Sequence, residues 1–248
     1  MRIRLIGHST VLFEAGGSRL LTDPFFGTWG NPAYARVAPP ALARDDVGPV
    51  DAVLLSHNHW DHTDRRYLRG LPPSVPVLAP RRSQWVTRLK GARRVDGIRP
   101  WESRQVGAVR VTAVPALHLA TTVGFVVEAP DGVAYFAGDT YHRPFMREVG
   151  ERFRLDVALM PVTTYRIPMT MGERGAVEAV RDLRVSRVIP IHLALQPRSP
   201  LLRTRQSPEG FAARLARAGL EAEVVMLQPG DEWVYEAAPL LRSSATPS

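Results

Sequence analysis

The stretch LLSHNHWDHTD, residues Leu54–Asp64, places three histidines and an aspartate within six positions. The whole chain of 248 residues contains only seven histidines. Such a stretch is either a polar loop or a metal site. Four ligand-type side chains at the spacing H-x-H-x-D-H are rare in a solvated loop, and imidazole is a common metal ligand. We therefore interpret the stretch as part of a metal site.

The spacing within the stretch is compatible with two ions. In an extended turn, His57 and His59 can point the same way and hold one ion. Asp61 and His62 lie around the bend, where they can reach a second ion beside the first. The chain has no cysteine, so nitrogen and oxygen atoms must hold any ion. Such ligands suit zinc, which we prefer, and also manganese or iron.

Three more candidate ligands stand at the ends of apolar segments that are typical of short buried strands. VRVTAVPAL leads into His118, VAYFAG into Asp139 and RVIPI into His192, just as DAVLL leads into the quoted stretch. An α/β scaffold builds a metal site where such strands end at one edge of a sheet. We expect these residues to meet at that edge, with the Asp139 carboxylate between two ions.

The order of the elements predicts one domain, residues 1–237, followed by a frayed tail at 238–248. The first half is mostly strands, with a hairpin turn at Gly16–Gly17, and the second half alternates helices with strands. We expect a long loop from Thr28 to Pro49. Helices are expected near residues 82–90, 144–152, 172–183 and 208–218. This pattern favours two sheets with external helices.

Composition limits the location and the partners of the protein. No apolar stretch approaches the roughly 18 residues that span a bilayer, and the N-terminus lacks the features of a signal peptide, so we expect a cytoplasmic protein. The net charge of +8 comes from arginine and one lysine, Lys90. Basic residues gather in the segment 79–94. We interpret this segment as a solvated helix face, with an acidic substrate, a lipid headgroup or nucleic acid as the alternative.

The motifs together resemble those of the metallo-β-lactamase superfamily. SHNHWDH, then a histidine, then AGDT, then a last histidine follow one another in the order typical of that superfamily, over nearly the whole chain. The resemblance implies an α/β fold, the four-layer αβ/βα sandwich, with two divalent metal ions at its edge. The implied ligands are His57, His59 and His118 for the first ion, and Asp61, His62 and His192 for the second, with Asp139 bridging.

A narrower resemblance concerns one branch of the superfamily. GHSTVLFEAGGSRLLTDPFF and YFAGDTYHRPFMREVGERF look like the branch that contains N-acyl phosphatidylethanolamine phospholipase D and the ascorbate-6-phosphate lactonases. The segment around His118 is shorter than in the phospholipases, and their long N-terminal extension is missing. We therefore do not expect phospholipid specificity.

The expected chemistry is hydrolysis. Two adjacent divalent ions lower the pKa of a shared water and polarise the substrate oxygen, which fixes the reaction but not the substrate. Asp61 is the expected catalytic residue, since it can orient the hydroxide and accept a proton. His8 is expected to bond a ligand carboxylate or to support its turn, and His142 to reach the substrate or to lie at the surface. For Asp23 we favour structural support of the metal loop.

Substrate recognition is assigned to the loops 25–38, 163–172 and 193–205 at the ligand edge. Their aromatic, Met and Arg side chains, Tyr165 and Arg166 among them, either pack on one another or suit an anionic or amphiphilic small molecule. We expect a phosphodiester substrate, with a lactone as the alternative. A sequence pI near 10.6 would suit a nuclease, but the dispersed arginines count against nucleic acid. The complete ligand set disfavours a binding protein without turnover. The oligomeric state is not predicted.

Overall fold

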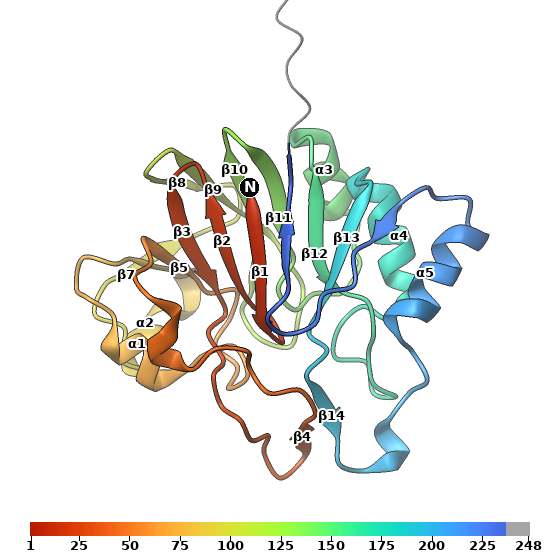
Figure 1. Cartoon of the computed structure of the whole chain (residues 1–248), viewed down its shortest axis with the longest axis horizontal. Helices are drawn as coiled ribbons and strands as arrows, with labels where there is room; N and C mark the ends of the chain where they lie inside the picture. Colours follow the sequence, from red (N-terminus) through yellow and green to blue (C-terminus); the bar gives the residue numbers. More distant parts are fainter. Residues whose placement is uncertain (237–248) are drawn as a thin grey trace, which may run out of the picture.

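Two seven-stranded sheets lie face to face at the centre of the molecule (Figure 1). The computed structural model describes residues 1–236, so the tail predicted at 238–248 lies outside the described residues. Helices cover the outer face of each sheet (Figure 1). The four-layer αβ/βα sandwich is therefore confirmed.

The first sheet has the order β16-β1-β2-β3-β5-β6-β7. Its antiparallel half turns tightly at Gly16 and Gly17, where φ angles of 53° and 74° give a turn that glycine adopts without strain. From β3 onward the strands are parallel. The strands are β1 (Arg2–Gly7), β2 (Thr10–Ala15), β3 (Ser18–Thr22), β5 (Ala52–Leu54), β6 (Val77–Pro80), β7 (Val95–Ile98) and β16 (Glu232–Val234).

The second sheet has the order β15-β13-β12-β11-β10-β9-β8. It is likewise antiparallel on one side, up to β11, and parallel beyond it. Its strands are β8 (Ser103–Val106), β9 (Val109–Pro115), β10 (Val123–Ala129), β11 (Gly132–Phe136), β12 (Val157–Pro161), β13 (Arg187–Ile191) and β15 (Glu223–Val224). Parallel strands end at the same edge, so polar residues that follow them are brought together.

Three buried apolar layers hold the sandwich together. The central layer joins the two sheets, with Phe13 and Leu54 from one and Phe125 from the other among its members. A second layer packs α1 (Arg65–Gly70) on the first sheet, and α2 (Gln84–Leu89) lies against β6 and β7. A third packs α3 (Phe145–Arg152), α4 (Glu173–Leu183) and α5 (Pro208–Arg217) on the second sheet (Figure 1).

The structure differs from the sequence-based expectation in the segment Thr28–Pro49. This segment contains the strand β4 (Tyr34–Arg36) and the 3₁₀ helix η1 (Arg44–Val47). β4 pairs antiparallel with β14 (Leu195–Pro197), a segment far away in the sequence. A strand of three residues is stable only through such a pairing, so local periodicity does not reveal it. The other 3₁₀ helices are η2 (Arg81–Ser83) and η3 (Pro200–Leu202).

Helix α1 was also not anticipated. Asp64 caps its N-terminus, because the side chain accepts hydrogen bonds from the backbone amides of Arg66 and Tyr67. The aspartate that closes the quoted stretch was therefore the signal for this helix. Within residues 1–236 no helix is both long enough and apolar enough to cross a bilayer.

Candidate metal centre

The candidate ligands lie together at one edge of the sandwich, each following a strand. Residues 57–62 follow β5, and His118 follows β9. Asp139 comes after β11, and His192 comes directly after β13. His8 follows β1 at the same edge. Five strands from both sheets thus end at one place, where three groups of side chains have the spacing of a metal site. Two of these groups share no residue, and the third combines Asp23 with His57 and His62.

His57, His59 and His118 form the first group, with one ligand atom of each within 4.8 Å of the others. Nε2 of His118 lies 3.2 Å from Nδ1 of His59. A tetrahedral zinc ion with bonds of about 2.0–2.1 Å places two ligand nitrogens about 3.4 Å apart. The separation of these two nitrogens therefore suits binding to a common ion.

His8, Asp61, His62 and His192 form the second group. Oδ2 of Asp61 lies 3.4 Å from Nε2 of His8 and 3.7 Å from Nε2 of His192. The structure thus places His8 beside Asp61, one of the ligands that the resemblance implied. His8 has no other polar partner for either ring nitrogen among the described residues.

Asp139 lies between the two groups. Its Oδ2 is 3.1 Å from Nε2 of His192 and 3.7 Å from Nε2 of His118, one residue of each group. Its Oδ1 is 3.4 Å from Nε2 of His62. Asp139 is buried, with 3 % of the residue exposed, and the carboxylate lies among these imidazoles.

Unpartnered buried nitrogens show that the cluster fits a cation. Among the described residues, Nε2 of His57, His62 and His192 is shielded from solvent and forms no hydrogen bond of good geometry, although the Asp139 carboxylate lies near the latter two. Buried polar atoms normally have a partner, and leaving one without costs about 1–3 kcal/mol. A divalent cation would satisfy all three nitrogens, and nitrogen with carboxylate oxygen is a donor set that such ions accept.

Charge at the centre is balanced between carboxylates and imidazoles. Burial raises the pKa of the Asp139 carboxyl, but His192 and His62 outweigh it and hold that pKa well below its usual range. Burial lowers the pKa of His192, but the nearby Asp139 carboxylate outweighs burial and raises this pKa to about 9. Burial and the charge of His62 hold the pKa of His57 well below its usual range, and burial lowers that of His118 to about 4. The first group therefore offers neutral imidazoles, the form that binds metal.

Asp23 and Ser56 orient one histidine of each group. The Ser56 hydroxyl donates to Oδ2 of Asp23 over 2.6 Å, and its oxygen lies 2.9 Å from Nδ1 of His57. The same Oδ2 lies 2.7 Å from Nδ1 of His62, and the Ser56 amide donates to Oδ1. With Nδ1 of each ring engaged, Nε2 is left for a metal. Asp23 was expected to support the metal loop; Ser56 was missed, because one serine beside a histidine carries no pattern.

Backbone strain gathers at the same place. Among the described residues other than glycine, five have positive φ, and three of these are His8, Asp23 and His192, at 59°, 33° and 65°. Side chains rarely adopt this conformation, and strained backbone is common at functional sites. The backbone amide of His192 donates to the carbonyl of His8 over 3.0 Å, which ties the two turns together.

Helix α2 secures the metal loop from the other side. The Asn58 side-chain amide donates to the Ser83 carbonyl, and the Thr87 hydroxyl donates to Oδ1 of Asn58 over 3.2 Å. The ammonium group of Lys90 donates to the backbone carbonyl of Asn58. The single lysine of the chain thus helps to hold the metal loop in place. Burial lowers its pKa.

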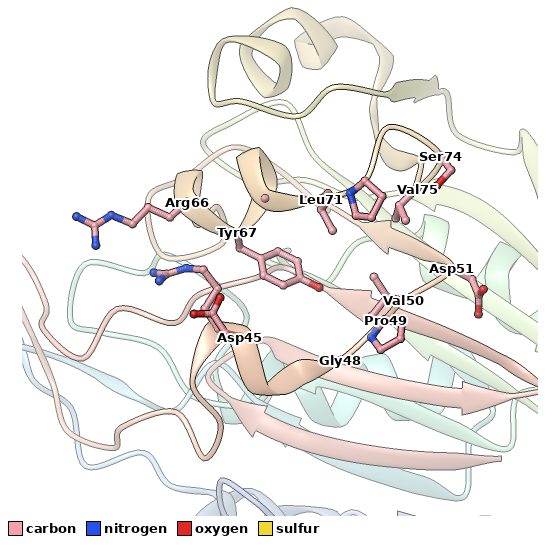
Figure 2. A pocket seen from close by; sticks show the side chains of 13 residues that line it. Asp45, Gly48, Pro49, Val50, Asp51, Arg66, Tyr67, Leu71, Ser74 and Val75 are labelled. Atoms are coloured by element: carbon pink, nitrogen blue, oxygen red, sulfur yellow. The ribbon is translucent and has the colours of Figure 1, made fainter.

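A cavity of about 230 Å³ opens over the cluster. His59 and His118 of the first group line it, together with Asp61 and His192 of the second group and Asp139. The remaining walls are aromatic or apolar. They are Tyr34 from β4, Leu195 from β14, Trp60, Tyr165 and Met169. A larger pocket of about 530 Å³ lies elsewhere, between η1 and α1, where Tyr67 points into it (Figure 2); the metal-type residues do not line it.

The structure places the other candidate residues as follows. Tyr165 lines the cavity, and its hydroxyl donates to the Leu195 carbonyl over 3.1 Å. Arg166 is exposed and does not line the cavity. His142 also lies outside, with Nε2 2.8 Å from Asp182 on α4. The structure therefore brings Tyr165, but neither Arg166 nor His142, to the site.

Comparison with known proteins shows the family and the fold. Residues 18–193 match the family described as beta-lactamase superfamily domain. The chain is 33% identical over 242 residues to a UPF0173 metal-dependent hydrolase of Pyrobaculum arsenaticum, an alignment that covers 93% of this chain and 98% of that protein.

Two solved structures have the same fold. A possible metal-dependent hydrolase from Veillonella parvula superposes with a TM-score of 0.79 at 19% identity, covering 94% of this chain and 98% of that one. An isothiocyanate hydrolase from Delia radicum gut bacteria superposes with a TM-score of 0.78 at 18% identity, covering 96% and 100%. At such identities the likeness shows the fold alone.

Proposed function

We propose that this chain, which belongs to the metallo-β-lactamase superfamily and is a metal-dependent hydrolase of that fold, cleaves a small ester-type substrate at a centre of two divalent ions, preferably zinc. The observation that carries the proposal is the meeting of two ligand groups at Asp139 beneath one cavity. The residues that would hold the ions are His57, His59 and His118 on one side, and Asp61, His62 and His192 on the other, with Asp139 shared.

When bound, such ions lower the pKa of a water molecule and polarise the substrate oxygen. The protein supplies the proton acceptor. Burial raises the pKa of Asp61, but His62, His192 and His8 outweigh it and hold the pKa well below its usual range, so the side chain is a carboxylate at neutral pH. Asp61 also lines the cavity. It is therefore the group placed to orient the attacking water and to take up its proton.

The lining of the cavity favours a neutral substrate. The residues around the metal-type side chains are two tyrosines, a tryptophan, a methionine and a leucine, and no arginine or lysine is among the described residues that line it. A phosphodiester carries a negative charge that proteins usually meet with arginine. The composition of the walls therefore favours a lactone or carboxylic ester over the phosphodiester preferred from the sequence, which stays a prediction. A volume of about 230 Å³ suits a small acyl group.

The test is a substrate panel with zinc-, manganese- and iron-reconstituted protein. It contains nitrophenyl acetate and butyrate, γ- and δ-lactones, and bis-nitrophenyl phosphate. We expect hydrolysis of a neutral ester or lactone, and at least a hundredfold loss in Asp61→Asn. Turnover of the phosphodiester alone would reverse the substrate assignment.

Metal content is measured on the same samples by elemental analysis. His59→Ala should lose bound metal and activity together, because it removes one ligand of the first group. His142→Ala is the matched control, since this histidine pairs with Asp182 outside the cluster, and it should keep both. Protein that binds no transition metal under any of these conditions would overturn the proposed centre.

A further inference from the structure

A second pocket adjoins the metal centre at the loop that carries His118. Its volume is about 420 Å³. Its walls come from three places: the end of β6 with η2, the residues after β7, and the loop between β9 and β10. His118 is the one residue that lines both this pocket and the cavity over the ligand cluster. We call it the arginine pocket, after Arg81, Arg82 and Arg99 in its lining.

The lining of the pocket is positively charged. It is lined by these three arginines and by no aspartate or glutamate of the described chain. None of the three guanidinium groups forms a hydrogen bond or an ion pair with another residue in 1–236. Nearby arginines do pair: Arg94 lies 3.3 Å from Asp96, and Arg104 lies 3.5 Å from Glu102. Three free guanidinium groups around one hollow favour an anion, because guanidinium bonds carboxylate and phosphate oxygens in pairs.

The remaining walls of the pocket are apolar. Ile98 and Val123 are buried, and Pro80, Pro100 and Ala116 complete this side. A bare inorganic anion would leave these walls without a contact, whereas an anion with a hydrocarbon part would cover them. The volume and the lining therefore suit a molecule that is charged at one end only.

We propose that the arginine pocket binds a small amphiphilic anion, a carboxylate or phosphate monoester with an apolar body. The basic segment 79–94 then has a specific role, because Arg81 and Arg82 belong to it and Arg99, directly after β7, lines the same pocket. Apart from the shared His118, the pocket has a lining different from that of the cavity over the ligand cluster, which contains no arginine or lysine of the described residues. Binding here does not depend on the proposed hydrolysis.

Calorimetric titration with octanoate, octyl phosphate, inorganic phosphate and uncharged octyl glucoside tests the proposal on the full-length protein. We expect at least one of the two amphiphilic anions to bind tenfold or more tightly than octyl glucoside, and inorganic phosphate to bind more weakly than octyl phosphate. The preference between the two headgroups tells a carboxylate from a phosphate ligand. Equal binding of octyl glucoside and of both anions would show apolar adsorption and overturn the proposal.

Charge-matched variants locate the ligand. Arg81→Gln/Arg82→Gln/Arg99→Gln should weaken anion binding at least tenfold. Arg69→Gln/Arg174→Gln/Arg217→Gln loses the same charge outside the pocket lining and should bind as the native protein does. Equal losses in the two triple variants would overturn a specific site. If circular dichroism shows that the first triple variant is unfolded, the single variants Arg81→Gln and Arg99→Gln are compared instead, and an affinity unchanged in both would overturn the proposal equally.

An anion in these titrations could also bind at the metal centre. The titrations are therefore repeated with His59→Ala and with chelator-treated protein. Anion affinity that persists in both places the ligand in the arginine pocket, whereas loss of binding in both would assign it to the metal ions. Since the readout is binding rather than turnover, failure of the substrate panel and failure of this proposal remain distinguishable.

Discussion

The Asp23 carboxylate lies 2.7 Å from Nδ1 of His62, and the same oxygen accepts the hydroxyl of Ser56 over 2.6 Å. Ser56 in turn contacts Nδ1 of His57 at 2.9 Å. If both imidazoles donate from Nδ1, both keep a lone pair on Nε2, the atom that faces the centre without a partner in the described chain. One buried carboxylate thus sets the donor atom of a histidine in each ligand group.

Replacing Asp23 with asparagine tests this arrangement. The amide keeps the shape of the side chain but loses the charge, and its NH₂ group cannot accept a hydrogen bond from His62. We expect metal affinity to fall by about 10- to 100-fold, as for other residues that orient metal-bound histidines. Competition with a chelating dye measures the affinity. Asp51→Asn is the control, because that carboxylate accepts a backbone amide from Arg19 at the surface, and it should leave the affinity unchanged.

Gly138, directly before Asp139, permits the close approach of the metal loop. A Cβ built on Gly138 would lie 2.6 Å from Cβ of Ser56, and its φ is 56°. Gly138→Ala should therefore lower the free energy of unfolding by about 1–3 kcal/mol through overpacking, on top of about 1 kcal/mol for the positive φ. Gly17→Ala separates the two effects, since its φ is 74° but nothing lies within 4 Å of the added carbon. Equal urea midpoints for the two variants would show that the contact with Ser56 is unimportant.

The sandwich was predictable because short segments of the sequence are enough to indicate its strands and turns. Buried strands show as short apolar runs whatever their partners are, and the glycine pair at 16–17 marks its turn by itself. The candidate ligands could be named for the same reason, since His118 and His192 come soon after a strand that is mostly apolar. The expected assignment of His118 and His192 to different ions came from the resemblance to a superfamily.

The walls of the cavity could not be predicted, because they depend on contacts between distant segments. Tyr34 reaches the site only through the pairing of β4 with β14, and three residues of either strand give no detectable pattern. The turn that contains His8 was recognisable in the sequence, but the position of His8 beside Asp61 was not. That position arises because β1 and β5 end at the same edge of the sheet.

Tyr67 gives a pH dependence of stability. Burial raises the pKa of its hydroxyl from 10.0 to about 12, against the opposing charge of Arg19. Between these values the unfolded chain has lost the proton that the folded protein keeps, so the unfolded state binds fewer protons and stability falls as pH rises. The loss is about 1.4 kcal/mol per pH unit, or about 2.7 kcal/mol over the whole interval. Below pH 10 the group contributes no pH dependence.

Tyr67→Phe removes this ionisation. Urea unfolding at pH 8 and pH 11 should show a smaller loss of stability in the variant than in the native protein. At pH 8 the two proteins should be close, because the Tyr67 hydroxyl has no hydrogen-bond partner among residues 1–236. An identical alkaline loss in both would mean that this tyrosine ionises equally easily in the folded and unfolded states.

Tyr165 connects the cavity to substrate recognition. Its hydroxyl donates to the Leu195 carbonyl over 3.1 Å, and its ring centroid lies 5.3 Å from that of Tyr34. The hydroxyl is thus engaged in holding two walls together. Tyr165→Phe should raise KM several-fold for the ester or lactone found in the panel, with kcat within about twofold and metal content unchanged, as expected when only ground-state positioning is lost. Tyr141→Phe, which loses a hydroxyl bonded to the Pro168 carbonyl away from the cavity lining, should change neither constant. A tenfold fall in kcat at constant KM would instead place the Tyr165 hydroxyl at the reacting atoms.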